Sequence, residues 1–212
     1  MASFLQRPLR YRYYNATIIL IVVNVIVFLL GFVGLQRAIE VYLGLTPLLV
    51  VQAGAWWQVV TYMFVHGGWG HIFFNMLALF LFGIQLEQRM GSTEFLLFYF
   101  ICGIGAGIAT LFINLATGQG AVDVVGASGA IFALLLAFAA FFPDARIFIF
   151  GILPMRAPVA VALYAGIEIF SSFTSFQSGV AHLTHLAGLA IAYLYLVVRY
   201  GMNPIAIFFR KR

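Results

Sequence analysis

Charged residues are scarce in this 212-residue chain. Lysine and arginine number 11, aspartate and glutamate number 6, and together they make up only 8% of the sequence. Hydrophobic residues account for 64%, and the mean hydropathy is +1.08. This composition excludes a soluble domain. Because the hydrocarbon layer of a bilayer is about 30 Å thick, a spanning helix needs about 20 apolar residues. We therefore predict a single all-α, polytopic membrane domain.

The single cysteine and the dispersed basic residues argue against a disulfide-bonded protein and against a nucleic-acid-binding protein. Cys102 is the only cysteine, so an intrachain disulfide is excluded, and its apolar surroundings favour a packing role over a reactive thiol. The net charge of +5 does not indicate a nucleic-acid partner, because the basic residues lie at the ends of apolar runs, where they set membrane topology. The apolar run at 16–35 is too long for a secretory signal and predicts a retained first helix.

Hydropathy predicts six spans, and charge counting predicts their orientation. Val41–Trp57 is apolar but interrupted by glycine and proline, and Ile147–Leu153 is too short to cross. With the N-terminus inside, ten of the eleven basic residues lie inside, and only Arg37 lies outside. We expect a cytoplasmic tail at 1–15, a six-helix domain at 16–200 and a basic cytoplasmic tail at 201–212. The six predicted spans are 16–35, 70–86, 95–115, 127–143, 157–172 and 181–198.

This topology places three polar islands at the outer ends of predicted helices: His66–Asn75, Gly126–Ser128 and His182–His185. Polar residues inside a membrane are functional candidates, because their burial in lipid is costly. Serine is a weak nucleophile until a base accepts its proton, so we predict that Ser128 works with His185. Gly188, one turn below His185, allows the last helix to approach its neighbour closely.

Acyl transfer also needs hydrogen-bond donors aimed at the developing oxyanion. Ser128, near a helix N-terminus, supplies its unsatisfied backbone N–H, and His71 and Asn75 lie at positions i and i+4 of one helix face. Each of these polar residues alone is compatible with a role in helix–helix packing. We expect Glu168 to be exposed to water, which favours a Ser–His dyad over a triad, and we expect His182 to face water at its helix end.

Four motifs together resemble the rhomboid intramembrane serine proteases over residues 16–198. The resemblance implies a six-helix rhomboid core that hydrolyses peptide bonds in or near transmembrane segments of membrane-protein substrates, with no cofactor or metal. The expected partners are those substrates and the lipid bilayer, with no nucleic acid and no oligomeric state assigned. The motifs are Gly126-Ala127-Ser128-Gly129-Ala130-Ile131-Phe132, His66-x4-His71-x3-Asn75, His185-x2-Gly188 and Gly83-x3-Glu87-x3-Gly91.

The resemblance assigns a role to each matching residue. Ser128 is the implied nucleophile and His185 the general base, while the Ser128 amide, His71 and Asn75 form the implied oxyanion site. Two departures are evident: Gln58 follows Trp57 where the family has arginine, and the aromatic residue one turn after the serine is phenylalanine where some members have tyrosine. The residues with implied structural or gating roles are His66, which shapes the first loop, Phe74 at a lateral gate, Phe132 stacked on His185, Gly126 and Gly188.

Three other classes of function remain as alternatives. Four histidines in a membrane suggest a metal or haem site, and His182 and His185 lie one turn apart, yet no His-Glu-x-x-His motif is present. A second alternative is a non-catalytic rhomboid-like protein that escorts membrane helices, and only a measurement of activity distinguishes it from a protease. A transporter usually shows inverted repeats or broken helices, which are not evident here. The expected location is a prokaryotic cytoplasmic membrane, with the active site open to the outer side.

Overall fold

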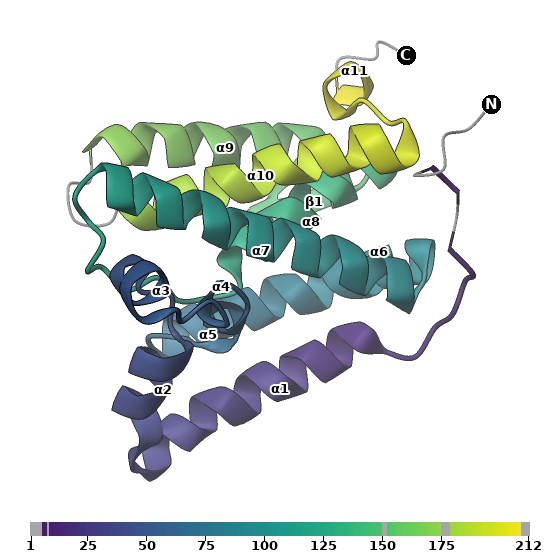
Figure 1. Ribbon diagram of the computed structural model, residues 1–212. Coiled ribbons are helices and arrows are strands. Elements are labelled where there is room, and N and C mark those ends of the chain that lie inside the picture. The colour runs from purple at the N-terminus through teal and green to yellow at the C-terminus, as the bar shows by residue number, and fades with distance from the viewer. Residues whose placement is uncertain (1–5, 8, 150–151, 175–178, 209–212) are drawn as a thin grey trace.

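The computed structural model describes residues 6–7, 9–149, 152–174 and 179–208, without the side chains of 179–181. The chain is mostly helical, as predicted (Figure 1). The helices are α1 (Ala16–Leu30), α2 (Gln36–Leu43), α3 (Pro47–Ala53), α4 (Gln58–Thr61), α5 (Trp69–Ala78), α6 (Ile84–Met90), α7 (Ser92–Ala116), α8 (Ser128–Phe141), α9 (Ala157–Thr174), α10 (Gly179–Tyr200) and α11 (Pro204–Phe208). Shorter elements are the π-helical turns η2 (Gly31–Leu35) and η4 (Leu79–Gly83), the 3-10 turn η3 (Tyr62–Phe64) and the strands β1 (Arg146–Ile149) and β2 (Leu153–Arg156).

Five helical segments of the described chain are long and apolar enough to cross a membrane, which confirms a multi-pass membrane protein. Two of them include π-helical turns, so that α1 continues into α2 and α5 into α6. The sixth apolar helix, α8, has only 14 residues and is about 21 Å long at 1.5 Å per residue. Because this is shorter than the hydrocarbon layer, the length of α8 does not establish a sixth crossing, and the count of six spans stays a prediction.

Helix α8 is the core of the bundle. It packs against α7, α9 and α10, and 11 of its 14 residues are buried. Two glycines allow the neighbouring helices to approach closely: a Cβ on Gly188 of α10 would lie 2.1 Å from the carbonyl oxygen of Gly129 in α8. A Cβ on Gly129 would in turn lie 2.9 Å from the side chain of Ala106 in α7. The backbones therefore meet at distances that only glycine permits, which fixes the first turn of α8 against α10.

Residues 36–69, which the sequence predicted as the connection between the spans 16–35 and 70–86, are largely helical. The chain turns at Gly34, with φ of 90°, and continues through α2, α3 and α4 (Figure 1). Leu45 exchanges two 2.9 Å backbone hydrogen bonds with Val124, which ties this connection to the segment before α8. Buried Gln58 accepts a hydrogen bond from the Thr46 N–H and donates one to the Val41 carbonyl. These bonds brace the segment at the position where the family has arginine.

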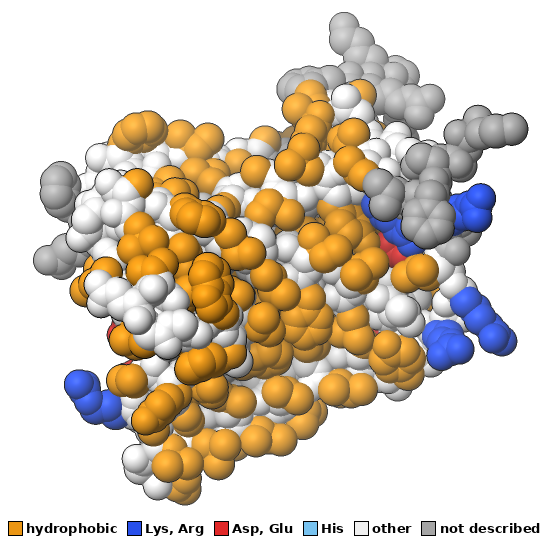
Figure 2. Space-filling view, in the orientation of Figure 1, with side chains coloured by type: hydrophobic (Ala, Val, Ile, Leu, Met, Phe, Trp, Pro, Cys, Tyr) orange, Lys and Arg blue, Asp and Glu red, His pale blue; other side chains and the backbone are white. Residues whose placement is uncertain are grey.

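Hydrogen bonds and an ion pair join the helices at the end of the bundle that carries both termini (Figure 1). The carboxylate of Glu87 accepts hydrogen bonds from the first two N–H groups of α1, at 2.6 and 2.9 Å. Glu94 in α7 forms a bidentate pair with Arg199 of α10. Basic side chains cluster at this same end in Figure 2, while the flank between the two ends is almost wholly hydrophobic. The segment Ile147–Leu153, predicted not to cross, contributes its described ends to the antiparallel strands β1 and β2, and residues 150 and 151 lie outside the described residues.

Candidate active site

Ser128 is the first residue of α8. The chain enters this helix through Gly126, whose φ of 115° favours glycine and whose N–H donates to the Tyr62 carbonyl at 2.9 Å. A Cβ at Gly126 would lie only 2.6 Å from Nε2 of His71. The backbone of this turn is thus held directly beside a histidine ring. The first N–H groups of α8 lack intrahelical acceptors, so the turn presents donors next to the serine hydroxyl.

His185 lies directly against the serine. Its Nε2 is 2.7 Å from Ser128 Oγ, and its ring is stacked on Phe132, with centroids 4.3 Å apart and planes 9° from parallel. Phe132 lies one turn after Ser128 on the same helix, so α8 supplies both the hydroxyl and the surface that orients the imidazole. A neutral imidazole that accepts the serine proton at Nε2 carries its own proton on Nδ1.

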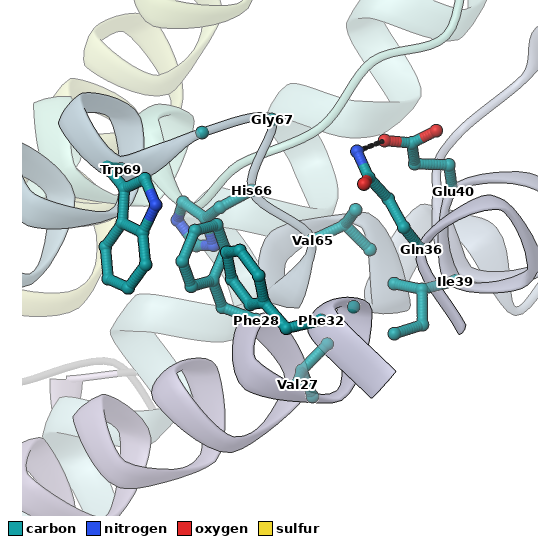
Figure 3. Close-up of a pocket in the computed structure, with 12 residues that line it drawn as sticks. Val27, Phe28, Phe32, Gln36, Ile39, Glu40, Val65, His66, Gly67 and Trp69 are labelled. Atoms are coloured by element: carbon teal, nitrogen blue, oxygen red, sulfur yellow. Dashed lines mark hydrogen bonds between the residues drawn. The ribbon is translucent and has the colours of Figure 1, made fainter. Parts of the chain in front are cut away.

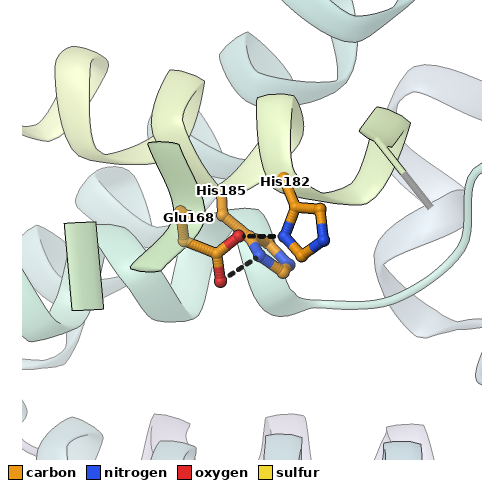
Figure 4. Close-up of side chains that lie close together, drawn as sticks. All are labelled: Glu168, His182 and His185. Carbon is orange, nitrogen blue, oxygen red and sulfur yellow. Dashed lines mark hydrogen bonds and ion pairs between the residues drawn. The ribbon is translucent and has the colours of Figure 1, made fainter. Parts of the chain in front are cut away.

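Glu168 of α9 is buried, with only 9% of its surface exposed, so the prediction that it faces water is wrong. Its Oε1 is 3.1 Å from His185 Nδ1, and its Oε2 is 2.5 Å from His182 Nδ1 (Figure 4). His182 was also expected to face water, but its side chain is only 20% exposed and pairs with this carboxylate. The sequence did not predict that these three side chains meet. The available signal was that Glu168 is the only acidic residue in a late apolar run.

The same three residues are the candidates for holding a metal. Within the described ranges, Glu168, His182 and His185 form the group whose possible donor atoms all lie within 4.8 Å of one another. In the present geometry each carboxylate oxygen faces the Nδ1 atom of one imidazole. We interpret the cluster as a carboxylate that bridges two histidines, and the absence of a cofactor stays a prediction.

His71 and Asn75 lie on α5. The Gly67 N–H donates to His71 Nδ1 at 3.4 Å, which leaves Nε2 to carry the proton and to face Gly126. Asn75 is buried; its Nδ2 donates to the His71 carbonyl at 2.7 Å. Asn75 Oδ1 is buried without a partner among the residues described. The structure therefore brings His71 to the serine turn, while the amide of Asn75 bonds within its own helix.

His66 lies between η3 and α5 and is 7% exposed. Its ring packs edge-on against His71, with centroids 5.0 Å apart. Burial, reinforced by the neighbouring His71, lowers the pKa of His66 to about 4, so its ring is neutral at physiological pH. His66 also lines a cavity of about 190 Å³ between α1 and the start of α5, together with Phe28 and Trp69 (Figure 3).

Phe74, expected at a lateral gate, is 68% exposed and packs against Phe73 on the outer face of α5.

Tyr62 is a supporting residue that the sequence did not indicate. Its hydroxyl donates to the Gly103 carbonyl at 2.7 Å, and burial raises the pKa of the phenol. Because the Tyr62 carbonyl also accepts the Gly126 N–H, this residue joins α7 to the turn that carries Ser128.

Taken together, the fold and the site define a multi-pass membrane protein in which a buried core helix presents a serine to a histidine. A family model described as the Rhomboid domain matches residues 53–201. The chain belongs to the rhomboid family.

Several relatives support this assignment. YdcA of Bacillus subtilis (strain 168), provisionally named a rhomboid protease, is 40% identical over 88 residues, which cover 41% of this chain and 41% of YdcA. RHOMBOID-like protein 5 of Arabidopsis thaliana is 36% identical over 93 residues, covering 44% of this chain and 29% of that protein. Rhomboid protease GluP of Bacillus subtilis is 37% identical over 86 residues, covering 41% and 16%. The matched segments thus span less than half the length of these curated relatives.

Proposed function

We propose that this protein is an intramembrane serine endopeptidase that cleaves peptide bonds in or near the transmembrane segments of other membrane proteins. The observation that carries the proposal is the 2.7 Å contact between Ser128 Oγ and His185 Nε2 at the N-terminus of the buried helix α8. Hydroxyl and imidazole at this separation form the nucleophile–base pair that acyl transfer requires. The rhomboid protease name of GluP supports the same reaction class.

In the proposed reaction, Ser128 Oγ attacks the scissile carbonyl carbon while its proton moves to His185 Nε2. The C–O bond formed gives a tetrahedral intermediate, whose oxyanion accepts hydrogen bonds from the Ser128 backbone N–H and from His71 Nε2–H. The protonated His185 then donates its proton to the leaving amine as the C–N bond breaks. Water, activated by the same imidazole, hydrolyses the acyl-enzyme.

Asn75 is proposed as a third oxyanion donor. One hydrogen of its Nδ2 bonds the His71 carbonyl, and the other is available to a substrate oxygen. His66 is proposed to maintain the shape of the first connection beside His71, and Phe74 to line the path by which a substrate helix enters. The expected location is a prokaryotic cytoplasmic membrane with the site open to the outer side.

The test is cleavage of a single-span membrane substrate by the full-length protein in liposomes, with fluorophosphonate labelling in parallel. We expect Ser128→Ala to abolish both cleavage and labelling, and His185→Ala to abolish cleavage. Ser172→Ala is the matched control, because Ser172 lies on α9 and bonds only the Ile169 carbonyl within that helix. Cleavage that persists in Ser128→Ala refutes the proposal. Substrate binding without cleavage or labelling by the wild type assigns a helix-escort role instead.

A further inference from the structure

We propose that Glu168 is a positioning residue for His185, so that the serine and histidine work as a Ser128–His185–Glu168 triad whose carboxylate is held by His182. The inference rests on the proposed function of Ser128 and His185. It adds a residue to which the sequence analysis gave no part in the reaction.

The first argument is the order of the groups in space. His185 Nε2 faces Ser128 Oγ at 2.7 Å, and the opposite ring nitrogen, Nδ1, faces Glu168 Oε1 at 3.1 Å. The imidazole therefore lies between the hydroxyl and the carboxylate. The hydroxyl comes from α8, the imidazole from α10 and the carboxylate from α9. Because the serine proton is directed to Nε2, the ring proton must lie on Nδ1, which is the tautomer that a carboxylate at this place stabilises.

The second argument is burial. An unpaired carboxylate is costly to bury, and an ionisable residue within a membrane helix is costly enough to indicate a function. Both oxygens of Glu168 face an imidazole nitrogen of α10, where His182 and His185 lie one turn apart (Figure 4). His182 thereby holds one oxygen of the carboxylate and leaves the other directed at His185.

The third argument concerns the charge that forms during the reaction. When His185 accepts the serine proton it becomes an imidazolium, and a negative charge 3.1 Å away stabilises it strongly in a site of low dielectric. At rest the imidazole is neutral, and the approach of Nδ1 to Oε1 is a close contact without the alignment of a good hydrogen bond. The contribution of Glu168 is therefore mainly electrostatic. Among the residues that the structure describes, the other titratable groups that face His185 are His71 from α5 and His182 from its own helix.

The deciding variant is Glu168→Gln in the full-length protein, which keeps the shape and removes the charge. In liposomes we expect kcat for a single-span substrate to fall about 10- to 100-fold, with little change in KM. The acidic limb of the pH profile should move to lower pH, because the imidazolium of His185 loses its stabilising partner. Glu168→Asp, which restores the charge, should recover part of kcat and return the acidic limb towards that of the wild type.

Glu94→Gln is the matched control, since Glu94 is also buried but bonds Tyr195 and Arg199 at the far end of α10. We expect this variant to lower the unfolding temperature and to leave the acidic limb unchanged. Where Glu168→Gln does not fold, Glu168→Asp decides the question: a kcat below that of the wild type, with an acidic limb slightly below the wild-type one, supports the role of Glu168, and wild-type values of both overturn it.

The outcomes separate the two proposals. Cleavage that persists in Ser128→Ala overturns the proposed function, and the triad with it. Cleavage that depends on Ser128, combined with wild-type kcat and an unmoved acidic limb in Glu168→Gln, overturns the role of Glu168 alone. All assays are repeated with EDTA: an unchanged wild-type profile supports the triad, whereas a changed one assigns the cluster of Glu168, His182 and His185 to a cation and overturns it.

Discussion

Burial of the His66 side chain makes the stability of the folded protein depend on pH. The His66 ring is buried against His71, and its pKa is about 4 instead of 6.5. Above pH 6.5 the ring is neutral in both the folded and the unfolded protein, so it has no effect on stability. As the pH falls from 6.5 towards 4, only the unfolded state gains this proton. The folded state then loses about 3 kcal/mol of relative stability.

We therefore predict that acidification destabilises the wild type more than a His66→Leu variant. The measurement is thermal unfolding in detergent micelles at several pH values between 7 and 4. Every other titrating group is common to the two proteins, so the difference between their unfolding temperatures isolates the effect of His66. Parallel curves over this range would show that protonation of His66 is not coupled to folding.

The sequence predicted some residues of the site better than others, for a physical reason. The chemistry of serine activation indicated Ser128 and His185 as partners, and their side chains lie 2.7 Å apart in the structure. The exposure of Glu168 was predicted wrongly, because a position near the end of a span says nothing about which way the helix is rotated. The face of α9 that bears Glu168 is turned towards α10, and this rotation depends on packing across the bundle.

At the scale of elements, the contact between α8 and α10 determines whether the proposed catalytic groups meet. A Cβ on Gly188 would lie 2.1 Å from the Gly129 carbonyl oxygen, which belongs to the backbone and cannot rotate away. We predict that Gly188→Ala forces the two helices apart, separates His185 from Ser128 and lowers cleavage at least about tenfold. Rates of substrate cleavage and of fluorophosphonate labelling measure the effect.

Gly166→Ala is the control for this prediction. Gly166 lies within α9, and no heavy atom lies within 4 Å of a Cβ built on it. Replacement of a helical glycine by alanine in open space stabilises a helix by roughly 0.5–1 kcal/mol, so this variant should be as active as the wild type and slightly more stable. Equal losses of activity in both variants would mean that the close contact of Gly188 has no special importance.

Elements were easier to predict than their connections. Gly44, Pro47 and Gly54, identified as breakers in Val41–Trp57, end α2, begin α3 and end α3 respectively. The helical nature of the connection was not predicted, because short helices depend on tertiary bonds more than on local propensity. Here those bonds come from buried Gln58 and from the pairing of Leu45 with the segment before α8.

For the molecule as a whole, the distribution of charge predicts how the bundle is oriented in the membrane. Both termini and most of the basic side chains lie at one end, where Glu87 caps α1 and Glu94 binds Arg199 (Figures 1 and 2). The opposite end carries α2 and α3 and the entrance to the serine turn. Because basic residues are retained on the cytoplasmic side, this asymmetry predicts that the serine turn is open to the outer side.

This topology can be tested with single cysteines, because the only native one, Cys102, is fully buried. In a Cys102→Ala background, Gln52→Cys lies on exposed α3 and Gln88→Cys on the exposed face of α6. In sealed right-side-out vesicles, a membrane-impermeant maleimide should label Gln52→Cys directly and Gln88→Cys only after detergent is added. The Cys102→Ala protein itself should stay unlabelled in both conditions. The reverse labelling pattern would place the termini outside. Equal labelling of both positions without detergent would put α3 and α6 on the same side of the membrane, which would contradict the predicted single crossing between them.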